Sequence, residues 1–324
     1  MKKFSKVILL AVAAMMVLTG CSLGSARAQD DSEFEIGIIQ LADHPALDDA
    51  RRGFEDGLKE LGVNARIAYQ NAQGEIPNTM TISQKFVSDQ VDLIYAIATP
   101  AAQGAKQATS EIPVLFSAVT DPVEAELVAS MENPGANVTG TSDLSPMDRQ
   151  LQLFKDLDES IKKVGIIYNT SEPNSQVQVE LAKELAPTIG LEIVEVGISN
   201  INDVTLALDS IVSKVDALYT ITDNMVASSI GLVANKALEN DLITVGGEDS
   251  HVKGGILMTD GISYYELGKQ TAVMAKEILV DGKSPSQIPA QTAVKTSKVF
   301  NEETLKGLNI DKNNKVFEDS TKID

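Results

Sequence analysis

The sequence predicts an α/β protein with two similar lobes, each built on a parallel sheet. From residue 35 onward, short apolar runs rich in β-branched residues alternate with longer amphipathic stretches. Such alternation is typical of parallel sheets with helices on both faces. The cycle begins again near residue 163, and the length of 324 residues suits about two domains. With 43% hydrophobic and 23% charged residues, the chain can bury a core.

The first half predicts five strands and four helices. The strands are expected at about residues 35–40, 65–70, 92–98, 113–117 and 137–141. The helices are expected near residues 46–61, 76–89, 100–109 and 122–131. Each of these helical stretches is amphipathic, which predicts one buried face.

The second half repeats this order. The strands are expected at about residues 163–168, 191–197, 216–221, 243–246 and 255–259. The helices are expected near residues 148–158, 174–188, 201–213 and 225–240. A last helix over 264–279 ends before Gly282, a typical helix stop, and a strand near 293–299 and a short helix near 301–307 follow. These extra elements predict that the chain crosses between the lobes more than twice, which would form a hinge.

The two halves also match in sequence. The segment VDLIYAIAT at 91–99 can be laid over VDALYTITD at 215–223, and IGII at 36–39 over VGII at 164–167. Chance matching of apolar strands is the alternative, because buried parallel strands draw on few residue types. The common order of elements favours two similar lobes.

Charge and composition exclude several classes of function. Lys and Arg total 27 against 46 Asp and Glu, so the net charge of −19 would repel a nucleic-acid backbone. With only His44, His251 and Cys21, the chain lacks the residues for His/Cys metal cages, disulfide frameworks or a Cys/His nucleophilic pair. Phosphate-loop, dinucleotide and nucleophile-elbow motifs are also absent from the sequence. We therefore expect no catalysis, no cofactor, no metal and no nucleic-acid partner.

The N-terminus predicts export. Three lysines precede an uncharged run over 7–18, which is shorter than the roughly 20 residues that span a bilayer and is typical of a signal peptide. The following Leu-Thr-Gly-Cys resembles the lipobox of bacterial lipoproteins, in which the cysteine, here Cys21, carries the lipid. An ordinary secretion signal cleaved near Ala26 or Ala28 is the alternative.

These features predict a signal peptide over 1–20 and a flexible tether over 21–33, which is small and polar. The folded body would lie outside the cytoplasmic membrane of a bacterial cell. Lipid on Cys21 would be its membrane attachment. A single tether and a hinge fit a monomer.

The ends of the predicted strands are where a ligand would bind, because loops there lead into helix N-termini. They carry small, hydroxylated or acidic residues. We expect ligand contacts from His44, Thr99, Pro100, Ala101, Ser117, Val119, Asp143, Asn169, Ser171, Asn174, Thr222, Asp223, Asn224 and Glu248. Such groups suit hydrogen bonds to a small polar molecule.

The chemistry of these ends suits an amino acid. Arginine occurs only at 27, 51, 52, 66 and 149, none of them at a predicted strand end, so a dianion has no fork-shaped partner. A single carboxylate could rest on backbone N–H groups after Thr99 or Ser171, while Asp143, Asp223 or Glu248 could receive a cation.

Structural roles remain open for several of these residues. Asp223 and Asn174 could simply cap helices, His44 could lie in a surface turn, and Glu248 could be a solvated acid. Tyr264 and Tyr265 could pack on the core or between the lobes rather than on a ligand.

Ordered segments of the chain resemble the solute-binding lipoproteins of ABC importers, in particular the branch of tryptophan- and tyrosine-binding proteins. These segments are HPALD (44–48), YQNAQG (69–74), ATPAAQ (98–103), FSAVTDP (116–122), NVTGTSD (137–143), YN (168–169), TDN (222–224), GGE (246–248) and YYELGKQ (264–270). They span about residues 34–310.

The resemblance implies a type I periplasmic-binding-protein fold, with two Rossmann-like lobes joined by three crossovers. It places residues 34–143 and 262–285 in one lobe and residues 144–261 and 286–324 in the other. It also implies capture of an amino acid, most simply an aromatic one, by hinge closure, and delivery to an ABC permease and its ATPase. Without any Trp in the chain, the aromatic ring would rest on Phe116, Pro100 or Tyr168.

Two alternatives keep the same fold. A sugar or nucleoside binder would use aromatic stacking together with Asp, Asn and Arg, and the lack of Arg at the strand ends disfavours it. A surface sensor or adhesin would keep the lipid but would have no transporter partner.

Overall fold

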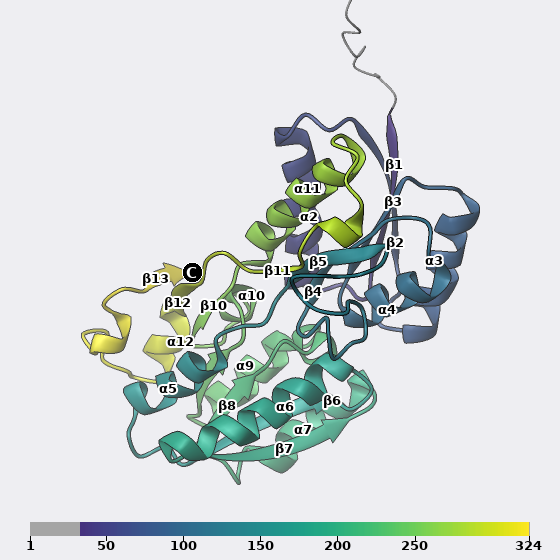
Figure 1. The fold of residues 1–324 in the computed structure, drawn as a ribbon. Coiled ribbons are helices and arrows are strands. Elements are labelled where there is room, and N and C mark those ends of the chain that lie inside the picture. The colour runs from purple at the N-terminus through teal and green to yellow at the C-terminus, as the bar shows by residue number, and fades with distance from the viewer. Residues whose placement is uncertain (1–32, 324) are drawn as a thin grey trace, which may run out of the picture. The chain divides into compact units, whose positions relative to one another are not determined.

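Two mostly parallel sheets, each flanked by helices, organise residues 33–323, the part of the chain that the computed structural model describes (Figure 1). The predicted signal peptide, Cys21 and the tether up to residue 32 lie outside the described residues. No helix within 33–323 has the length and apolar character that crossing a membrane requires.

The first sheet has the strand order β11-β5-β4-β3-β1-β2, and all its strand pairs are parallel. Its strands are β1 (Phe34–Gln40), β2 (Ala65–Asn71), β3 (Leu93–Ile97), β4 (Val114–Val119), β5 (Val138–Ser142) and β11 (Gln291–Thr292). Its helices are α2 (Pro45–Glu60), α3 (Ile76–Ser88), α4 (Thr99–Ala108) and α11 (Tyr264–Leu279). Helices α2 and α11 cover one face and α3 and α4 the other, so β3, β4 and β5 are buried along their whole length.

The second sheet has the order β13-β12-β10-β9-β8-β6-β7, in which only the β10–β12 pair is antiparallel. Its strands are β6 (Lys163–Asn169), β7 (Glu192–Ile198), β8 (Ala217–Thr220), β9 (Ile243–Gly246), β10 (Met258–Gly261), β12 (Ser297–Asn301) and β13 (Thr321–Ile323). The accompanying helices are α5 (Met147–Leu157), α6 (Pro173–Leu185), α7 (Val204–Ile211), α8 (Asn224–Ala227), α9 (Ile230–Glu239), α10 (Asp249–Lys253) and α12 (Glu302–Gly307). Short 3-10 turns occupy Ala186–Ile189, Ile201–Asp203, Pro285–Gln287 and Lys315–Phe317.

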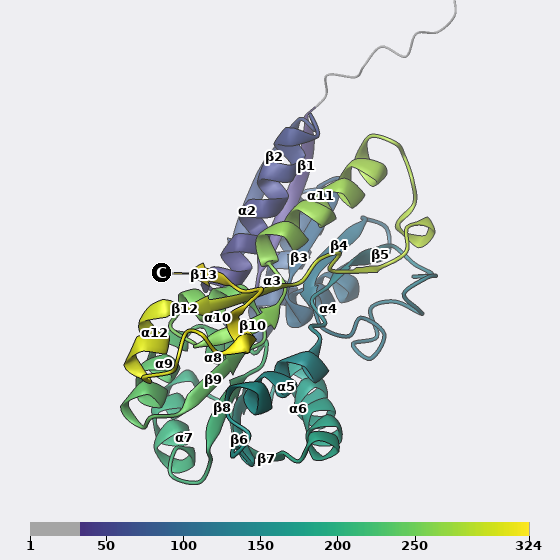
Figure 2. The same ribbon diagram turned by 90° about the vertical axis from the view of Figure 1, so that its left-hand side faces the viewer.

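The chain passes between the two sheets three times within the described residues: from β5 to α5, from β10 to α11 and from β11 to β12 (Figure 2). The expected α/β class, parallel sheets and repeated crossing are therefore confirmed. The expected lobe boundary at 285 and 286 stays a prediction. Strand β11 still pairs with the first sheet at residues 291–292.

The helix expected over 122–131 is wrong, because this segment forms turns. The Asp121 carboxylate accepts the backbone N–H groups of Val123 and Glu124, as the residue before a helix does, but the helical turn that starts here does not continue. Glu126 then adopts a left-handed backbone with φ of 57°, which a right-handed helix cannot contain.

Smaller differences fall at element ends. The helix expected over 225–240 is two helices, α8 and α9, because Ser229 leaves the helical region with ψ of 19°. The strand expected at 255–259 lies at Met258–Gly261, and the strand expected at 293–299 lies at Ser297–Asn301 as β12, with the short β11 before it. Helix α10 and strand β13 have no counterpart among the predicted elements.

Candidate functional site

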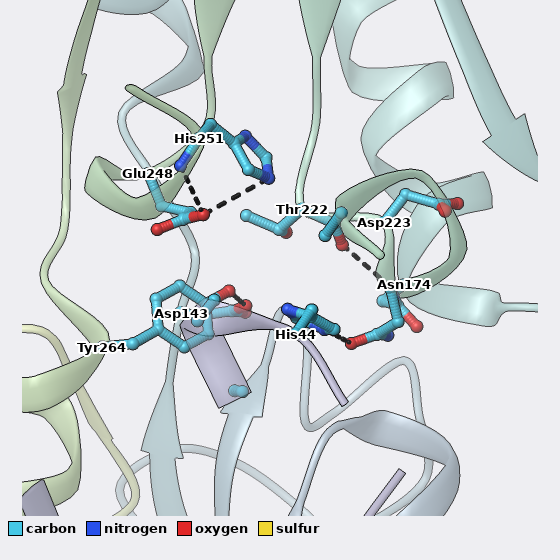
Figure 3. A pocket seen from close by; sticks show the side chains of 12 residues that line it. His44, Asp143, Asn174, Thr222, Asp223, Glu248, His251 and Tyr264 are labelled. Atoms are coloured by element: carbon cyan, nitrogen blue, oxygen red, sulfur yellow. Dashed lines mark hydrogen bonds and ion pairs between the residues drawn. The ribbon is translucent and has the colours of Figure 1, made fainter. Parts of the chain in front are cut away.

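A buried cavity lies where the carboxyl ends of the two sheets meet (Figure 3). Its walls come from the end of β4, from the loops after β1, β5, β8 and β9, and from α2, α6, α8, α10 and α11. The lining residues are His44, Ala46, Ala118, Asp143, Asn174, Thr222, Asp223, Asn224, Ala227, Glu248, His251 and Tyr264. The side chains approach so closely that the cavity has a volume of about 10 Å³, enough for a single water molecule.

Local sequence explains why polar groups gather here. Helices α2 and α6 each carry a proline in the first turn, which needs no backbone N–H at that position and starts the helix directly after the strand-end loop. The residues just before these helices, and those in their first turns, are thereby held at the sheet edges. His44 precedes α2 and Asn174 follows Pro173.

Part of the predicted contact set meets at this cavity. These residues are His44, Asp143, Asn174, Thr222, Asp223, Asn224 and Glu248, and they come from loops next to both sheets. The strand-end rule therefore brings residues far apart in the sequence to one place.

The other predicted contacts lie elsewhere. Thr99, Pro100, Ala101, Phe116, Ser117 and Val119 are buried within the first sheet and its helix α4. Phe116 and Val119 belong to the hydrophobic cluster beneath α3 and α4, and the Ser117 hydroxyl pairs with Thr141 at 3.1 Å. Asn169 and Ser171 line a larger neighbouring cavity with a volume of about 550 Å³.

Several lining residues were outside the predicted set. Tyr264 was expected to have a packing role as readily as a ligand role, and His251 and the three alanines carried no signal. Ala118 has a left-handed backbone with φ of 58°, beside a bulge between Phe116 and Val119. Such strained non-glycine residues gather at functional sites, but the sequence pattern does not mark them.

Asp143 has a free carboxylate oxygen in the cavity wall. Its Oδ2 accepts a hydrogen bond from the Tyr264 hydroxyl, whereas its Oδ1 is buried without a partner. Burial raises the pKa of Asp143, and the bond from Tyr264 opposes that rise. A ligand group that donates hydrogen bonds would satisfy this oxygen.

Asp223 and Glu248 are occupied by their own helices. Asp223 caps α8 by accepting the Val226 N–H at 2.8 Å, and its Oδ2 accepts the Ser175 hydroxyl at 2.7 Å. Glu248 caps α10 by accepting the N–H groups of Ser250 at 2.6 Å and His251 at 3.0 Å. Of the three acids expected to receive a cation, Asp143 is the one with a free buried oxygen.

The two histidines are neutral at pH 7. Burial lowers the pKa of His44 to about 4 and that of His251 to about 3. His44 Nε2 lies 3.2 Å from Asn224 Oδ1, a bond that joins the two sheets, and its Nδ1 is buried without a partner. His251 lies between Thr220 at 3.2 Å and Glu248 at 3.3 Å. No group of acidic, His or Cys side chains within 33–323 could hold a metal ion.

The depressed pKa of His44 predicts a pH-dependent loss of stability. The unfolded chain binds the proton from about pH 6.5 downward, whereas the folded protein resists it down to about pH 4. The unfolded state is therefore favoured progressively as the pH falls across this window. The variant His44→Gln can still donate to Asn224 but does not titrate. We therefore expect it to avoid a loss of up to about 3 kcal/mol in the free energy of unfolding at pH 4.

Urea unfolding of both proteins at pH 7, 5.5 and 4 measures this difference. The free energy of unfolding of His44→Gln should rise relative to that of the parent protein as the pH falls. A constant difference across the three pH values would contradict the assigned burial of neutral His44.

Two sheets crossed three times, with a polar cavity between their carboxyl ends, define a binding protein that encloses a small ligand. The family model for ABC transporter substrate binding proteins matches residues 35–323, and the chain belongs to this family. Its members bind ligands and are not enzymes, and they work outside the cytoplasm. The fold is the expected type I periplasmic-binding-protein fold.

Three similar proteins bear on the ligand and the conformation. A tyrosine-binding protein of Clostridioides difficile (strain R20291) is 44% identical, over 96% of this chain and 93% of the relative. A Streptococcus pneumoniae ABC domain in complex with L-Trp is 32% identical with a TM-score of 0.86, covering 90% of this chain and 100% of that one. A ligand-free, open substrate binding protein with adhesive properties from Clostridium difficile is 44% identical with a TM-score of 0.69, covering 90% and 99%.

Proposed function

We propose that this protein captures an aromatic amino acid in the cavity between its two lobes and delivers it to an ABC importer. The observation that carries the proposal is the free, buried Oδ1 of Asp143, in a cavity with polar walls from both sheets. The similarity to a tyrosine-binding protein and to an L-Trp complex supports the choice of ligand.

The two charged ends of an amino acid have separate partners in this proposal. The ammonium group would donate to Asp143 Oδ1 and to Asn174 Oδ1, which is also buried without a partner. The carboxylate would rest at the N-terminal turn of α2, where Ala46 lines the cavity and the first backbone N–H groups have no partner within the helix. No Lys or Arg lines this cavity, which disfavours a dianionic ligand.

The side chain of the ligand would lie against small residues. Ala46, Ala118 and Ala227 leave more room than larger side chains would once the walls separate, and Tyr264 is the aromatic residue in the lining. Phe116, which we expected to support the ring, is fully buried in the core beneath the first sheet. A sugar or nucleoside remains the alternative ligand, and thermal shifts with each class of ligand distinguish it from an aromatic amino acid.

Hinge closure would enclose the ligand. A cavity of about 10 Å³ cannot admit an amino acid, so the lobes, proposed as 34–143 with 262–285 and 144–261 with 286–324, must separate. The His44–Asn224 bond and an ion pair of Lys253 with Asp49 at 3.3 Å join the two sides in the present arrangement. This chain superposes better on the L-Trp complex than on the open, ligand-free relative, although the latter is closer in sequence.

The importer context rests on family membership. We propose a permease and an ATPase as partners, a monomeric state, and a lipid on Cys21 as the anchor to the cell membrane. Replacement Cys21→Ser should release the protein from the membrane fraction and abolish incorporation of a labelled fatty acid. Retention of the label in this variant would contradict the anchor.

The ligand is tested with a soluble form beginning at Ser22, which keeps every residue of the unit 33–324. The protein is unfolded and refolded to remove carried-over ligand, and its melting temperature is measured with twenty amino acids, common sugars and nucleosides. We expect a rise of several degrees with tyrosine, tryptophan or phenylalanine, since only the folded state binds. X-ray scattering should then detect a smaller radius of gyration with that ligand.

A shift with sugars or nucleosides alone would overturn the ligand. A shift with an aromatic amino acid but no compaction in scattering would overturn closure. The two parts of the proposal therefore fail separately.

A further inference from the structure

Glu172 is a buried acid directly behind the cavity wall. It is 3% exposed and precedes α6, but its side chain does not cap that helix. Its Oε1 accepts the side-chain amide of Asn169 at 3.1 Å. Its Oε2 accepts the amide of Asn174 at 3.3 Å, the backbone N–H of Asn224 at 3.4 Å, and the side-chain amide of Asn224.

This carboxylate sets the orientation of two lining amides, together with the Thr222 carbonyl oxygen, which also accepts from the NH₂ group of Asn174, at 3.2 Å. Burial raises the pKa of Glu172 to about 7, and the ionised form can only accept hydrogen bonds, so it holds the NH₂ groups of Asn174 and Asn224 toward itself. Their carbonyl oxygens then face away from Glu172. Asn224 Oδ1 meets His44 Nε2 at 3.2 Å, and Asn174 Oδ1 is left without a partner.

The orientation of the Asn224 amide also determines which nitrogen of His44, a residue next to the first sheet, carries the proton. Because Asn224 Oδ1 only accepts, His44 Nε2 must carry the proton, and the neutral ring then has a lone pair on Nδ1. That atom is buried without a partner, like Asn174 Oδ1 and Asp143 Oδ1. The three unpartnered polar atoms of the cavity-lining residues are therefore all acceptors.

We propose that Glu172 is a positioning residue that makes the cavity selective for ligands carrying an ammonium group. It does not contact the ligand. It holds the amides of Asn174 and Asn224 so that their oxygen atoms face away from it and can accept hydrogen bonds. An ammonium group supplies three N–H donors to such a set, whereas a ligand without it leaves buried acceptors unpaired. The inference rests on the proposed function and names the ligand group that this site requires.

The substitution Glu172→Gln tests this role because it keeps the shape and introduces one NH₂ group. Asn169 cannot turn to meet that group without losing the bond from the Ser171 N–H to its Oδ1, at 3.0 Å. Asn174 can turn without losing a bond at its Oδ1, which has no partner, although its NH₂ group then leaves the Thr222 carbonyl oxygen, to which it donates at 3.2 Å. The cavity would then present an NH₂ group in place of an acceptor.

Calorimetric titration with L-tyrosine and with 3-(4-hydroxyphenyl)propionate, which lacks the amino group, measures the effect. We expect Glu172→Gln to weaken tyrosine binding about 10- to 100-fold, the range for a hydrogen bond to a charged group. Binding of the amino-free acid should be unchanged or tighter. The matched control is Glu180→Gln on the same helix, because Glu180 is 73% exposed and should leave both affinities unchanged.

A second variant keeps the test decisive if the first fails to fold. The double variant Glu172→Gln with Asn174→Asp places the carboxylate at position 174. There it accepts a hydrogen bond from the amide introduced at position 172 and returns an acceptor to the cavity. Discrimination between the two ligands should therefore be restored. Equal losses for both ligands, no change in Glu172→Gln, or a folded double variant that does not discriminate would each overturn the proposal. Failure of the parent protein to bind tyrosine, tryptophan and phenylalanine would instead overturn the proposed function.

Discussion

Asp143→Asn is expected to weaken binding of an aromatic amino acid by about 100-fold or more, as loss of one partner in a buried charge pair does. The free Oδ1 of Asp143 is the one buried carboxylate oxygen of the lining without a partner. Asparagine removes the charge but can still accept the Tyr264 hydroxyl. Calorimetry with the parent protein and the variant measures the change.

The same substitution, Asp143→Asn, should not lower the stability of the folded protein. Burial raises the pKa of Asp143, so the folded state disfavours the ionised form, and this cost grows as the pH rises above the unfolded pKa. The variant lacks that cost and should be at least as stable at pH 7. The matched control is Asp148→Asn, an exposed acid on α5, which should change neither quantity. Unchanged affinity in Asp143→Asn would remove Asp143 from the site.

The sequence predicted most of the fold because buried parallel strands and amphipathic helices have distinct patterns. It failed at 122–131, where composition resembles a helix but Glu126 adopts a left-handed backbone with φ of 57°. It also missed α10, whose five residues are too few for a periodic pattern. Short elements such as α10 and β13 depend on tertiary packing rather than on local propensity.

The candidate site was predictable in part, from the rule that ligands bind at the carboxyl ends of parallel strands. That rule led to His44, Asp143 and Asn174 but could not tell a lining residue from one turned into the core, such as Phe116. Glu172 and Tyr264 differ in kind, since their roles depend on the amide of Asn224 and the carboxylate of Asp143, which they meet across the fold. Spacing along the chain carries no record of such long-range pairs.

Helix α11 connects the packing of the first sheet with one wall of the cavity. Helix α11 begins directly after the second crossing, and its first residue, Tyr264, lines the cavity. The same helix lies against α2 in both views of the molecule (Figure 1, Figure 2). Its packing on α2 therefore affects both the stability of the first sheet and the position of a cavity wall.

Gly268→Ala should lower the free energy of unfolding by about 3 kcal/mol, the upper range for overpacking a core. A Cβ atom at Gly268 would lie 2.0 Å from the backbone oxygen of Ala50 and 2.8 Å from the backbone nitrogen of Phe54. Backbone atoms inside a helix cannot move aside as a flexible side chain can, so α2 and α11 must separate. Thermal and urea unfolding of the soluble protein measure the loss.

The matched control is Gly231→Ala on α9, where a Cβ atom would meet nothing within 4 Å. Alanine is the better helix former, so this variant should gain a few tenths to about 1 kcal/mol. The same substitution thus has opposite signs at two helical glycines, because close backbone contact decides one case and helix propensity the other. A stabilised Gly268→Ala protein would show that α2 and α11 can shift apart without cost. The close contact between these helices would then not constrain the cavity wall that Tyr264 forms.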